Sequence, residues 1–238
     1  MTELLCQHDA YLRTFAATVT GSDADGRVTL DRSAFYPTGG GQPHDTGTLR
    51  WRGGEAAVVA VAKEGGEVWH VLEGDTPAPG TDVEGEVDWD RRYALMRTHT
   101  ALHVLCGVIW NQWGKAVTGG NMEPLSARMD FEFDPLPDGF GPAVEELVNL
   151  ELAQGRPVEV GFLPRSEAVL DDALIRTKIN LVPESVAEIR VVDIVGLDKQ
   201  ADGGTHVANT SEVGRIRVVK TESKGKAFKR IRIEVLDA

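Results

Sequence analysis

The chain has 238 residues, of which 42% are hydrophobic and 26% charged, and its formal net charge is −12. This composition is typical of a globular protein with one large or two modest domains, and no apolar run approaches the roughly 20 residues that a membrane-spanning helix needs. The N-terminus lacks the basic segment and apolar core of a signal peptide, and the two cysteines are too few for a disulfide framework. We therefore expect a cytoplasmic protein with no membrane partner.

Basic residues are concentrated near the C-terminus. Between positions 215 and 232 the chain has eight basic residues and one acidic residue, Glu222, so this segment carries a net charge of +7 and the rest of the chain −19. The net negative charge of the whole chain argues against nucleic-acid binding, because phosphate contacts need cations. A local basic patch would still allow one end of a nucleic acid to dock, whereas a solvated pair of strands explains the same pattern. Both interpretations stay open at this point.

The first domain is predicted at residues 1–89 and consists of β-strands. Short runs of β-branched and apolar residues alternate with turns rich in glycine and aspartate, a pattern typical of a small barrel or sandwich. The expected strands cover residues 16–19, 27–30, 48–51, 56–62, 68–72 and 83–87.

The second domain, residues 90–238, is predicted to mix helices with antiparallel strands, so the fold class is α+β. Asp90 is expected to cap a helix over residues 91–113, in which apolar residues recur at helical spacing. Trp110 and Trp113 in this helix are expected to pack in the core or in an interface. Further helices are expected at 141–154, where Pro142 lies in the first turn, and at 166–174. The expected strands cover residues 127–133, 158–163, 189–194, 206–209, 214–221 and 228–235.

Two histidines four positions apart give the clearest chemical signal. His99 and His103 fall on one face of the predicted helix, where both imidazoles can reach one metal ion, although such a pair alone is more often a packing or surface feature. A third histidine, His206, follows Asp202 through two glycines that permit a tight turn. Three histidines and one carboxylate fit Zn²⁺, which accepts nitrogen and oxygen ligands in tetrahedral geometry.

A zinc protease is excluded by one residue. Such enzymes have the sequence His-Glu-x-x-His, in which the glutamate is the general base. Here Thr100 follows His99, and a threonine hydroxyl cannot replace a carboxylate base.

Four motifs occur in chain order and together cover most of the sequence. They are SAFYPTGGGQPHDTG at 33–47, HTALH at 99–103, GGTHV with NTSEVG at 203–214, and ESKGK at 222–226. In these motifs the chain resembles the editing domain of alanyl-tRNA synthetase and the freestanding alanyl-tRNA editing proteins of the AlaX type. The freestanding type is the better match, because the chain has no room for an aminoacylation domain before the barrel. The resemblance implies hydrolysis of an aminoacyl ester at the acceptor end of mischarged tRNA(Ala), with serine as the first rejected amino acid and glycine as the second.

The resemblance also implies that His99, His103 and His206 bind one zinc ion. The usual fourth ligand in the family is a cysteine, and Asp202 stands at that position. Three alternatives stay open. Asp202 takes the place of the thiolate as the fourth ligand, the site keeps three histidines and a water molecule, or metal binding is weakened. Cys106 is expected to be a small buried residue rather than a substitute ligand.

Further residues are expected to contact the substrate. The glycine turn with Gly40, Gly41 and Gln42 is assigned by the resemblance to the aminoacyl-adenosine end, and the alternative is a plain turn of the barrel. Thr118 either hydrogen-bonds the serine hydroxyl, which alanine lacks, or is an ordinary turn residue. The candidates for phosphate contacts are Lys224, Lys226, Lys229 and Arg230.

Two other functions are left open by the sequence. One is a metal-dependent hydrolase of small aminoacyl esters that uses the same ligands. The other is a tRNA-binding module with a structural or inactive metal site, which the departure at Asp202 permits. Of the remaining histidines, His8 and His70 are expected to be structural, and His44 a polar loop residue.

Overall fold

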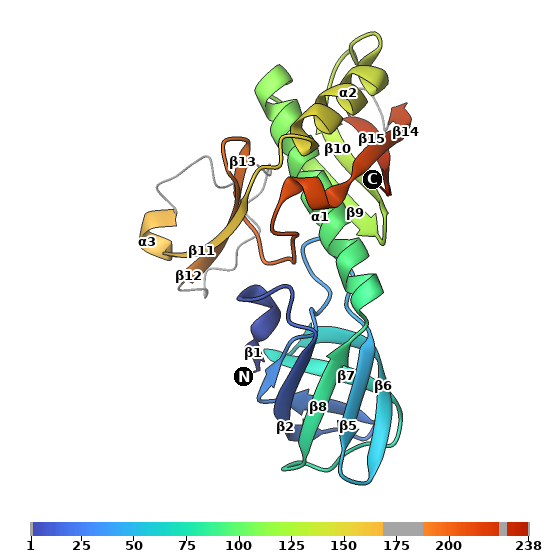
Figure 1. The fold of residues 1–238 in the computed structure, drawn as a ribbon, viewed down its shortest axis with the longest axis vertical. Helices are drawn as coiled ribbons and strands as arrows, with labels where there is room; N and C mark the ends of the chain where they lie inside the picture. The colour runs from blue at the N-terminus through green and yellow to red at the C-terminus, as the bar shows by residue number, and fades with distance from the viewer. Residues whose placement is uncertain (1, 169–187, 224–227, 238) are drawn as a thin grey trace. The chain divides into compact units, whose positions relative to one another are not determined.

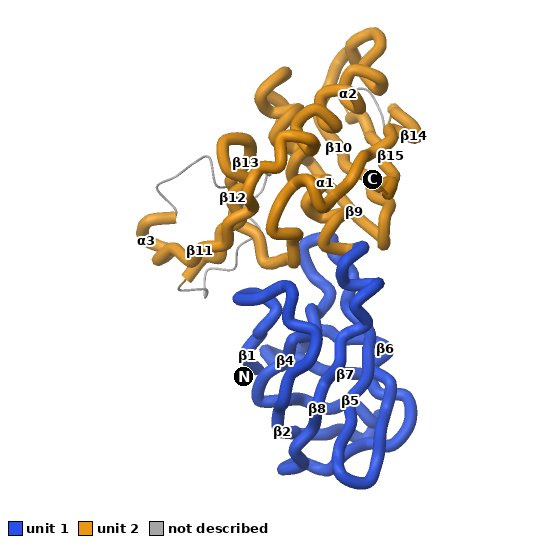
Figure 2. The backbone as a smooth tube through the Cα atoms, in the orientation of Figure 1, with its two compact units in different colours: residues 1–94 blue, residues 95–238 orange. Residues whose placement is uncertain are grey.

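The computed structural model describes residues 2–168, 188–223 and 228–237. The chain divides into two compact units, residues 1–94 and 95–238 (Figure 2). The division falls inside helix α1 (Trp89–Trp113), so this helix belongs to both units. In the described parts of the chain, no helix is long and apolar enough to cross a membrane.

The first unit contains a closed antiparallel barrel, which confirms the prediction of a small β-barrel (Figure 1). The strand order around it is β2-β3-β7-β6-β5-β8, and β8 pairs again with β2. The barrel strands are β2 (Thr14–Ser22), β3 (Arg27–Leu30), β5 (Gly47–Trp51), β6 (Gly54–Glu64), β7 (Glu67–Gly74) and β8 (Asp82–Val87). The unit also contains the short parallel pair β1 (Glu3–Leu4) and β4 (Arg32–Ser33), and a 3-10 turn at Leu5–Gln7.

Alternate side chains along each strand point into the barrel and fill its interior. In β2, Phe15, Ala17 and Val19 are buried, and the residues between them are exposed or half-buried, as expected for a strand with one face in a core. Gly85 of β8 pairs with Phe15, and a Cβ atom at Gly85 would lie only 2.3 Å from the Phe15 ring. The ring therefore occupies the space that the neighbouring strand leaves free.

A buried ion pair joins the first turn of α1 to the glycine-rich segment within the first unit. The Arg92 guanidinium donates to both carboxylate oxygens of Asp45, and both side chains are fully buried. Asp45 also accepts the backbone N–H of Tyr36 at 2.6 Å, and Arg92 donates to the carbonyl of Ala10 at 2.9 Å. Because breaking such a pair leaves an uncompensated buried charge, this contact fixes the segment that contains the glycine turn.

Helix α1 matches the predicted range of 91–113, with a different cap. Asp88 is the capping residue, because its Oδ1 accepts the N–H of Arg91 at 3.2 Å, and Asp90 lies within the first turn. The prediction of Asp90 as the cap is therefore wrong by two residues. From Leu95 to Ile109 nearly every position is buried, so this part of the helix is a core element rather than a surface helix with one apolar face.

The described residues of the second unit combine α1 with two antiparallel sheets and two further helices, which confirms the α+β class (Figure 1). One sheet has the order β14-β15-β10-β9 and the other β11-β12-β13. The strands are β9 (Val117–Glu123), β10 (Ser126–Glu132), β11 (Val158–Pro164), β12 (Glu188–Ile194), β13 (Asp198–Ala201), β14 (Arg215–Ser223) and β15 (Phe228–Leu236). The helices are α2 (Phe140–Leu152) and α3 (Arg165–Ala168), and a 3-10 turn covers Thr210–Val213.

Helix α1 contacts both sheets of this unit. In the turn between β9 and β10, the backbone N–H of Leu125 donates to Thr98 Oγ1 at 2.9 Å. The turn between β12 and β13 approaches the helix at Gly107, where a Cβ atom would lie 3.1 Å from the carbonyl oxygen of Leu197. A side chain at position 107 would thus meet the backbone of that turn.

Some local expectations for the second unit are wrong. Residues 206–209 form a loop instead of a strand, because Asn209 caps the following 3-10 turn by accepting the N–H of Ser211 at 2.9 Å. Thr118 lies in strand β9 and not in a turn, since pairing with β10 outweighs the turn preference of the two glycines after it. Trp110 is 40% exposed, so the core alternative is wrong for this residue and the interface alternative stays a prediction, whereas Trp113 packs against Phe140.

The short helix predicted at residues 166–174 is seen only as α3, Arg165–Ala168. The remainder of the predicted range, 169–174, lies outside the described residues.

Candidate metal centre

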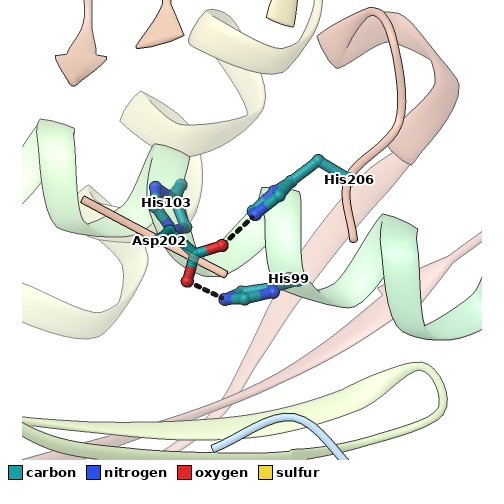
Figure 3. Close-up of side chains that lie close together, drawn as sticks. All are labelled: His99, His103, Asp202 and His206. Carbon is teal, nitrogen blue, oxygen red and sulfur yellow. Dashed lines mark hydrogen bonds and ion pairs between the residues drawn. The ribbon is translucent and has the colours of Figure 1, made fainter. Parts of the chain in front are cut away.

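Four side chains from two separate parts of the chain converge in the second unit (Figure 3). His99 and His103 come from successive turns of α1, and Asp202 and His206 from the loop after β13. The Nε2 atom of His206 lies 3.0 Å from Oδ2 of Asp202, and the Nε2 atom of His99 lies 3.6 Å from Oδ1. One possible ligand atom from each of the four residues lies within 4.8 Å of the others.

The loop that carries Asp202 and His206 is held by hydrogen bonds at both ends. The Asp202 carboxylate accepts the backbone N–H of Gly204 at 2.7 Å, which closes the tight turn expected from the two glycines. The buried Arg190 of β12 donates to the Asp202 carbonyl at 2.9 Å and accepts the Asp202 N–H at its own carbonyl. Farther along, the N–H of Val207 donates to Thr100 Oγ1 at 3.2 Å and ties the loop to α1.

Two of the histidines also make contacts outside the cluster. The Nδ1 atom of His103 lies 3.0 Å from Oδ2 of Asp198, a buried residue of β13. The Nδ1 atom of His206 lies 3.2 Å from Thr100 Oγ1. With Nδ1 engaged in this way, both rings present Nε2 toward the cluster. The threonine that excludes a zinc protease thus has a role in holding a ligand candidate.

Burial is the largest influence on the ionisation of the cluster. It holds the pKa of His99 well below the usual value and lowers the pKa of His206 to about 4. Burial alone would raise the pKa of Asp202, but the neighbouring histidines, His99 first, hold it well below its usual range. Burial also acts to lower the pKa of His103, but the hydrogen bond to Asp198 and the negative charges of Asp198 and Asp202 together outweigh it, so the pKa is raised. Near neutral pH the cluster thus offers a carboxylate at Asp202 and neutral imidazoles at His99 and His206, the forms that bind cations, whereas His103 would release a proton on binding a metal.

The donor set and its spacing fit a zinc ion. With metal–ligand bonds of roughly 2.1 Å, the ligand atoms of a tetrahedral site lie about 3.4 Å apart. The Asp202 carboxylate lies 3.0 Å from His206 Nε2 and 3.6 Å from His99 Nε2, close to that value, and all four ligand atoms lie within 4.8 Å of one another. Cys106 is buried, and its sulfur accepts a hydrogen bond from Gln200 Nε2 at 3.3 Å, as expected for a residue of the core.

The other predicted site residues lie elsewhere in the two units. Gly40 and Gly41 are exposed at the tip of a tight turn in the first unit, closed by reciprocal backbone hydrogen bonds between Gly39 and Gln42. Both central glycines have positive φ angles of 58° and 86°, which suit glycine. The Gln42 side chain is buried. Thr118 is half-buried at a register shift between β9 and β10 in the second unit.

Two of the four predicted phosphate contacts, Lys229 and Arg230, lie in strand β15. Lys229 donates to Ser223 Oγ at 3.0 Å, and Arg230 forms two hydrogen bonds of 2.7 Å with the carboxylate of Asp130 in β10. Lys224 and Lys226 lie outside the described residues. Arg230 would therefore reach a phosphate only by sharing its contact with Asp130.

Sequence patterns gave no indication of Asp198, Gln200 or Arg190 as residues beside the site. Asp198 and Gln200 alternate with a half-buried lysine and read as a surface strand, yet both are buried. Their roles depend on the packing of β12 and β13 against α1, which no local spacing reveals.

Comparisons with known proteins agree with this architecture. Residues 10–91 match the family model for tRNA synthetases class II (A), and residues 189–232 match the model for the threonyl and alanyl tRNA synthetase second additional domain. The protein, with its β-barrel, its α+β unit and its His/Asp cluster, thus belongs to the class of proteins that share domains with these synthetases.

The chain belongs to the family of alanyl-tRNA editing proteins AlaX-M, which confirms the resemblance seen in the four motifs. It is 36% identical over 243 residues to the alanyl-tRNA editing protein AlaX-M of Methanosarcina barkeri, with 100% of both chains covered. It is 37% identical over 234 residues to the AlaX-M protein of Saccharolobus solfataricus, with 97% and 98% covered. An alanine–tRNA ligase of Pyrobaculum neutrophilum is 42% identical over 229 residues, which are 93% of this chain and 25% of the ligase.

Proposed function

We propose that this protein is a trans-editing hydrolase that deacylates mischarged tRNA(Ala) at a zinc site formed by His99, His103, Asp202 and His206. Seryl-tRNA(Ala) is the principal substrate in this proposal and glycyl-tRNA(Ala) the second. Membership of the AlaX-M family supports the reaction class. The convergence of four ligand atoms within 4.8 Å is the observation that carries the proposal for the site.

Each residue of the cluster has a defined part in holding the metal. In this proposal His99, His103 and His206 would bind the metal through Nε2, and Asp202 would supply the anionic oxygen. The Gly204 N–H and the Arg190 guanidinium keep the Asp202 backbone and carboxylate in place. A bound zinc ion would supply Lewis acidity for the ester carbonyl or a bound water of lowered pKa.

Recognition of serine is assigned to Thr118. This residue lies where the β9–β10 register shifts, since Gly119 pairs with Asp130 while Val117 pairs with Phe131. Such bulges re-aim a side chain and are enriched beside active sites. In this proposal the Thr118 hydroxyl forms a hydrogen bond with the hydroxyl of the seryl group. Alanine has no hydroxyl, so the threonine would lose this bond and alanyl-tRNA(Ala), the correctly charged tRNA, would be disfavoured.

The contacts to the tRNA itself are assigned to two further groups of residues. The turn at Gly40 and Gly41, with Gln42 beside it, is proposed to contact the aminoacyl-adenosine end through its backbone amides. Lys229 and Arg230 of β15 are proposed phosphate contacts, and Lys224 and Lys226, which lie outside the described residues, complete the proposed set.

A deacylation assay tests the proposal. Seryl-, glycyl- and alanyl-tRNA(Ala) are compared with and without a metal chelator, and zinc content is measured in parallel. We expect loss of seryl-tRNA hydrolysis on chelation and its return with added zinc. His99→Ala should lose both activity and zinc, whereas the exposed His8→Ala serves as the matched control and should keep both.

Three outcomes would contradict the proposal. Near-normal turnover by His99→Ala after loss of zinc would remove the metal from the reaction. Hydrolysis of small seryl esters at rates equal to those on tRNA would point to a general ester hydrolase. A full zinc complement with tRNA binding and no deacylation would indicate a binding module with a structural metal.

A further inference from the structure

A second buried aspartate, Asp198, lies behind the candidate metal centre. It is not one of the four clustered residues, and its Oδ2 atom lies 3.0 Å from Nδ1 of His103. The Asp198 side chain has no solvent exposure, and that of His103 is 8% exposed. A carboxylate is seldom buried without a specific partner, because its desolvation is costly. The partner of Asp198 is Nδ1 of His103, the ring nitrogen that is not proposed to bind zinc.

Close packing of α1 against β13 puts Asp198 in this place. Gly107 lies one helical turn after His103, and a Cβ atom there would lie 3.1 Å from Cβ of Asp198 and 3.0 Å from the Leu197 side chain. The absence of a side chain at position 107 lets the start of β13 come close to the helix. The Asp198 carboxylate can then reach the imidazole from the β13 side.

Gln200 holds the carboxylate in position. It lies two residues later on the same buried face of β13, and its Nε2 donates to Asp198 Oδ2 at 2.7 Å and to Cys106 Sγ at 3.3 Å. Oδ2 of Asp198 thus accepts from both Gln200 and His103. The amide also links β13 to α1 through Cys106, which lies one turn after His103 on the helix.

The direction of the hydrogen bond determines what His103 can offer to a metal. A carboxylate only accepts, so Nδ1 of His103 carries a proton, and Nε2 is the ring nitrogen left to bind a metal. Such a carboxylate–histidine–metal arrangement fixes the ring and its tautomer and raises the basicity of the ligand nitrogen. We propose that Asp198, supported by Gln200, is a positioning residue that holds His103 as a metal ligand. This inference rests on the proposed zinc site.

Metal affinity, measured separately from activity, tests the proposal. The zinc dissociation constant is determined by competition with a chromophoric chelator for wild type, Asp198→Asn and Asp198→Ala. Removing such a partner typically weakens metal binding about 10- to 100-fold, so we expect that loss for Asp198→Ala. Asp198→Asn keeps a carbonyl acceptor without the charge and should be intermediate. The matched control is Asp193→Asn on the neighbouring strand β12, whose carboxylate pairs with Lys199 at 3.9 Å.

A purely structural role would give a different pattern. In that case the melting temperature of the metal-free variants would fall while the zinc dissociation constant of the folded fraction stayed within threefold of wild type, and this result would overturn the inference. The visible spectrum of the cobalt-substituted protein gives a second readout, because a displaced His103 changes the ligand field. We expect an altered spectrum for Asp198→Ala and an unaltered one for Asp193→Asn.

The wild-type protein provides a test that does not depend on the folding of variants. Long-range ¹H–¹⁵N NMR spectra of the zinc-loaded protein should show His103 with a protonated Nδ1 and a metal-bound Nε2. A metal-bound Nδ1 would refute the role of Asp198 while leaving the zinc site intact. Absence of zinc binding by the wild type would instead refute the proposed site itself, so the two failures are distinguishable.

Discussion

Acidification is expected to destabilise the barrel in part through one buried residue, His70. This histidine of β7 is fully buried, with Nε2 at 2.8 Å from Ser33 Oγ and Nδ1 at 3.3 Å from the Val28 carbonyl oxygen. A carbonyl only accepts, so Nδ1 carries the proton and Nε2 accepts from the serine hydroxyl. The barrel therefore holds a neutral imidazole in one tautomer, which agrees with the expected structural role.

The size of the effect follows from the difference in pKa. Burial lowers the pKa of His70 from 6.5 to about 4, while the hydrogen bond to Val28 acts in the opposite direction. Below pH 6.5 the unfolded chain binds a proton that the folded barrel does not, so the stability from His70 is complete above pH 6.5 and is lost as the pH falls toward 4. At about 1.4 kcal/mol per pH unit, the loss by pH 4 is about 3 kcal/mol.

The measurement compares metal-free wild type with His70→Gln by urea unfolding at pH 7 and pH 4. Groups that titrate elsewhere, including the clustered histidines, contribute equally to both proteins and cancel in the difference. We expect the gap in unfolding free energy between the two proteins to narrow by about 3 kcal/mol at pH 4. NMR should place the pKa of His70 near 4 with the proton on Nδ1. A gap that does not change with pH, or titration of His70 near 6.5, would refute the reasoning.

Three further substitutions have definite expected outcomes. Gly107→Ala should lower the melting temperature of the metal-free protein. Overpacking against Leu197 costs about 1–3 kcal/mol, whereas the gain in helix propensity is only about 1 kcal/mol. A higher melting temperature of the variant, measured by circular dichroism, would contradict this packing argument. Asp45→Asn should cost about 3 kcal/mol in urea unfolding, since it leaves the buried Arg92 without its anion; an unchanged midpoint would contradict this. Thr118→Val should lower the ratio of the deacylation rate on seryl-tRNA(Ala) to the rate on alanyl-tRNA(Ala). An unchanged ratio would show that Thr118 does not select the substrate.

Local spacing was sufficient to predict each half of the candidate site, and the family resemblance joined the two halves. His99 and His103 share a helix face because the helical period is 3.6 residues, and this geometry needs no tertiary information. Asp202 and His206 were grouped through the glycines between them, and the Gly204 N–H bonded to Asp202 shows the tight turn that those glycines permit. The barrel was predictable for a similar reason, because alternation in strands such as β2 reflects one buried face.

Tertiary pairing decided the features that were not predicted. Thr118 precedes two glycines, which favour a turn in isolation, but β10 offers a partner strand that extends this segment. The segment after His206 has the apolar residue Val207 and reads as a strand, yet its N–H is taken by Thr100 and the chain then enters a cap at Asn209. Helical spacing predicts which residues share a face of a helix, but not whether another element covers that face, and the exposed Trp110 is an example.

The basic segment shows why a charge count along the chain differs from the charge that a ligand meets. The count of +7 for residues 215–232 includes Arg217 and Arg230. Their partners are Glu234, beyond the segment on β15, and Asp130 on β10. Antiparallel pairing thus supplies carboxylates that the count left out, and Arg230 and Asp130 are only 12% and 18% exposed. Phosphate binding on this hairpin therefore depends on the cations that these pairs leave available, and less on the total charge of the segment.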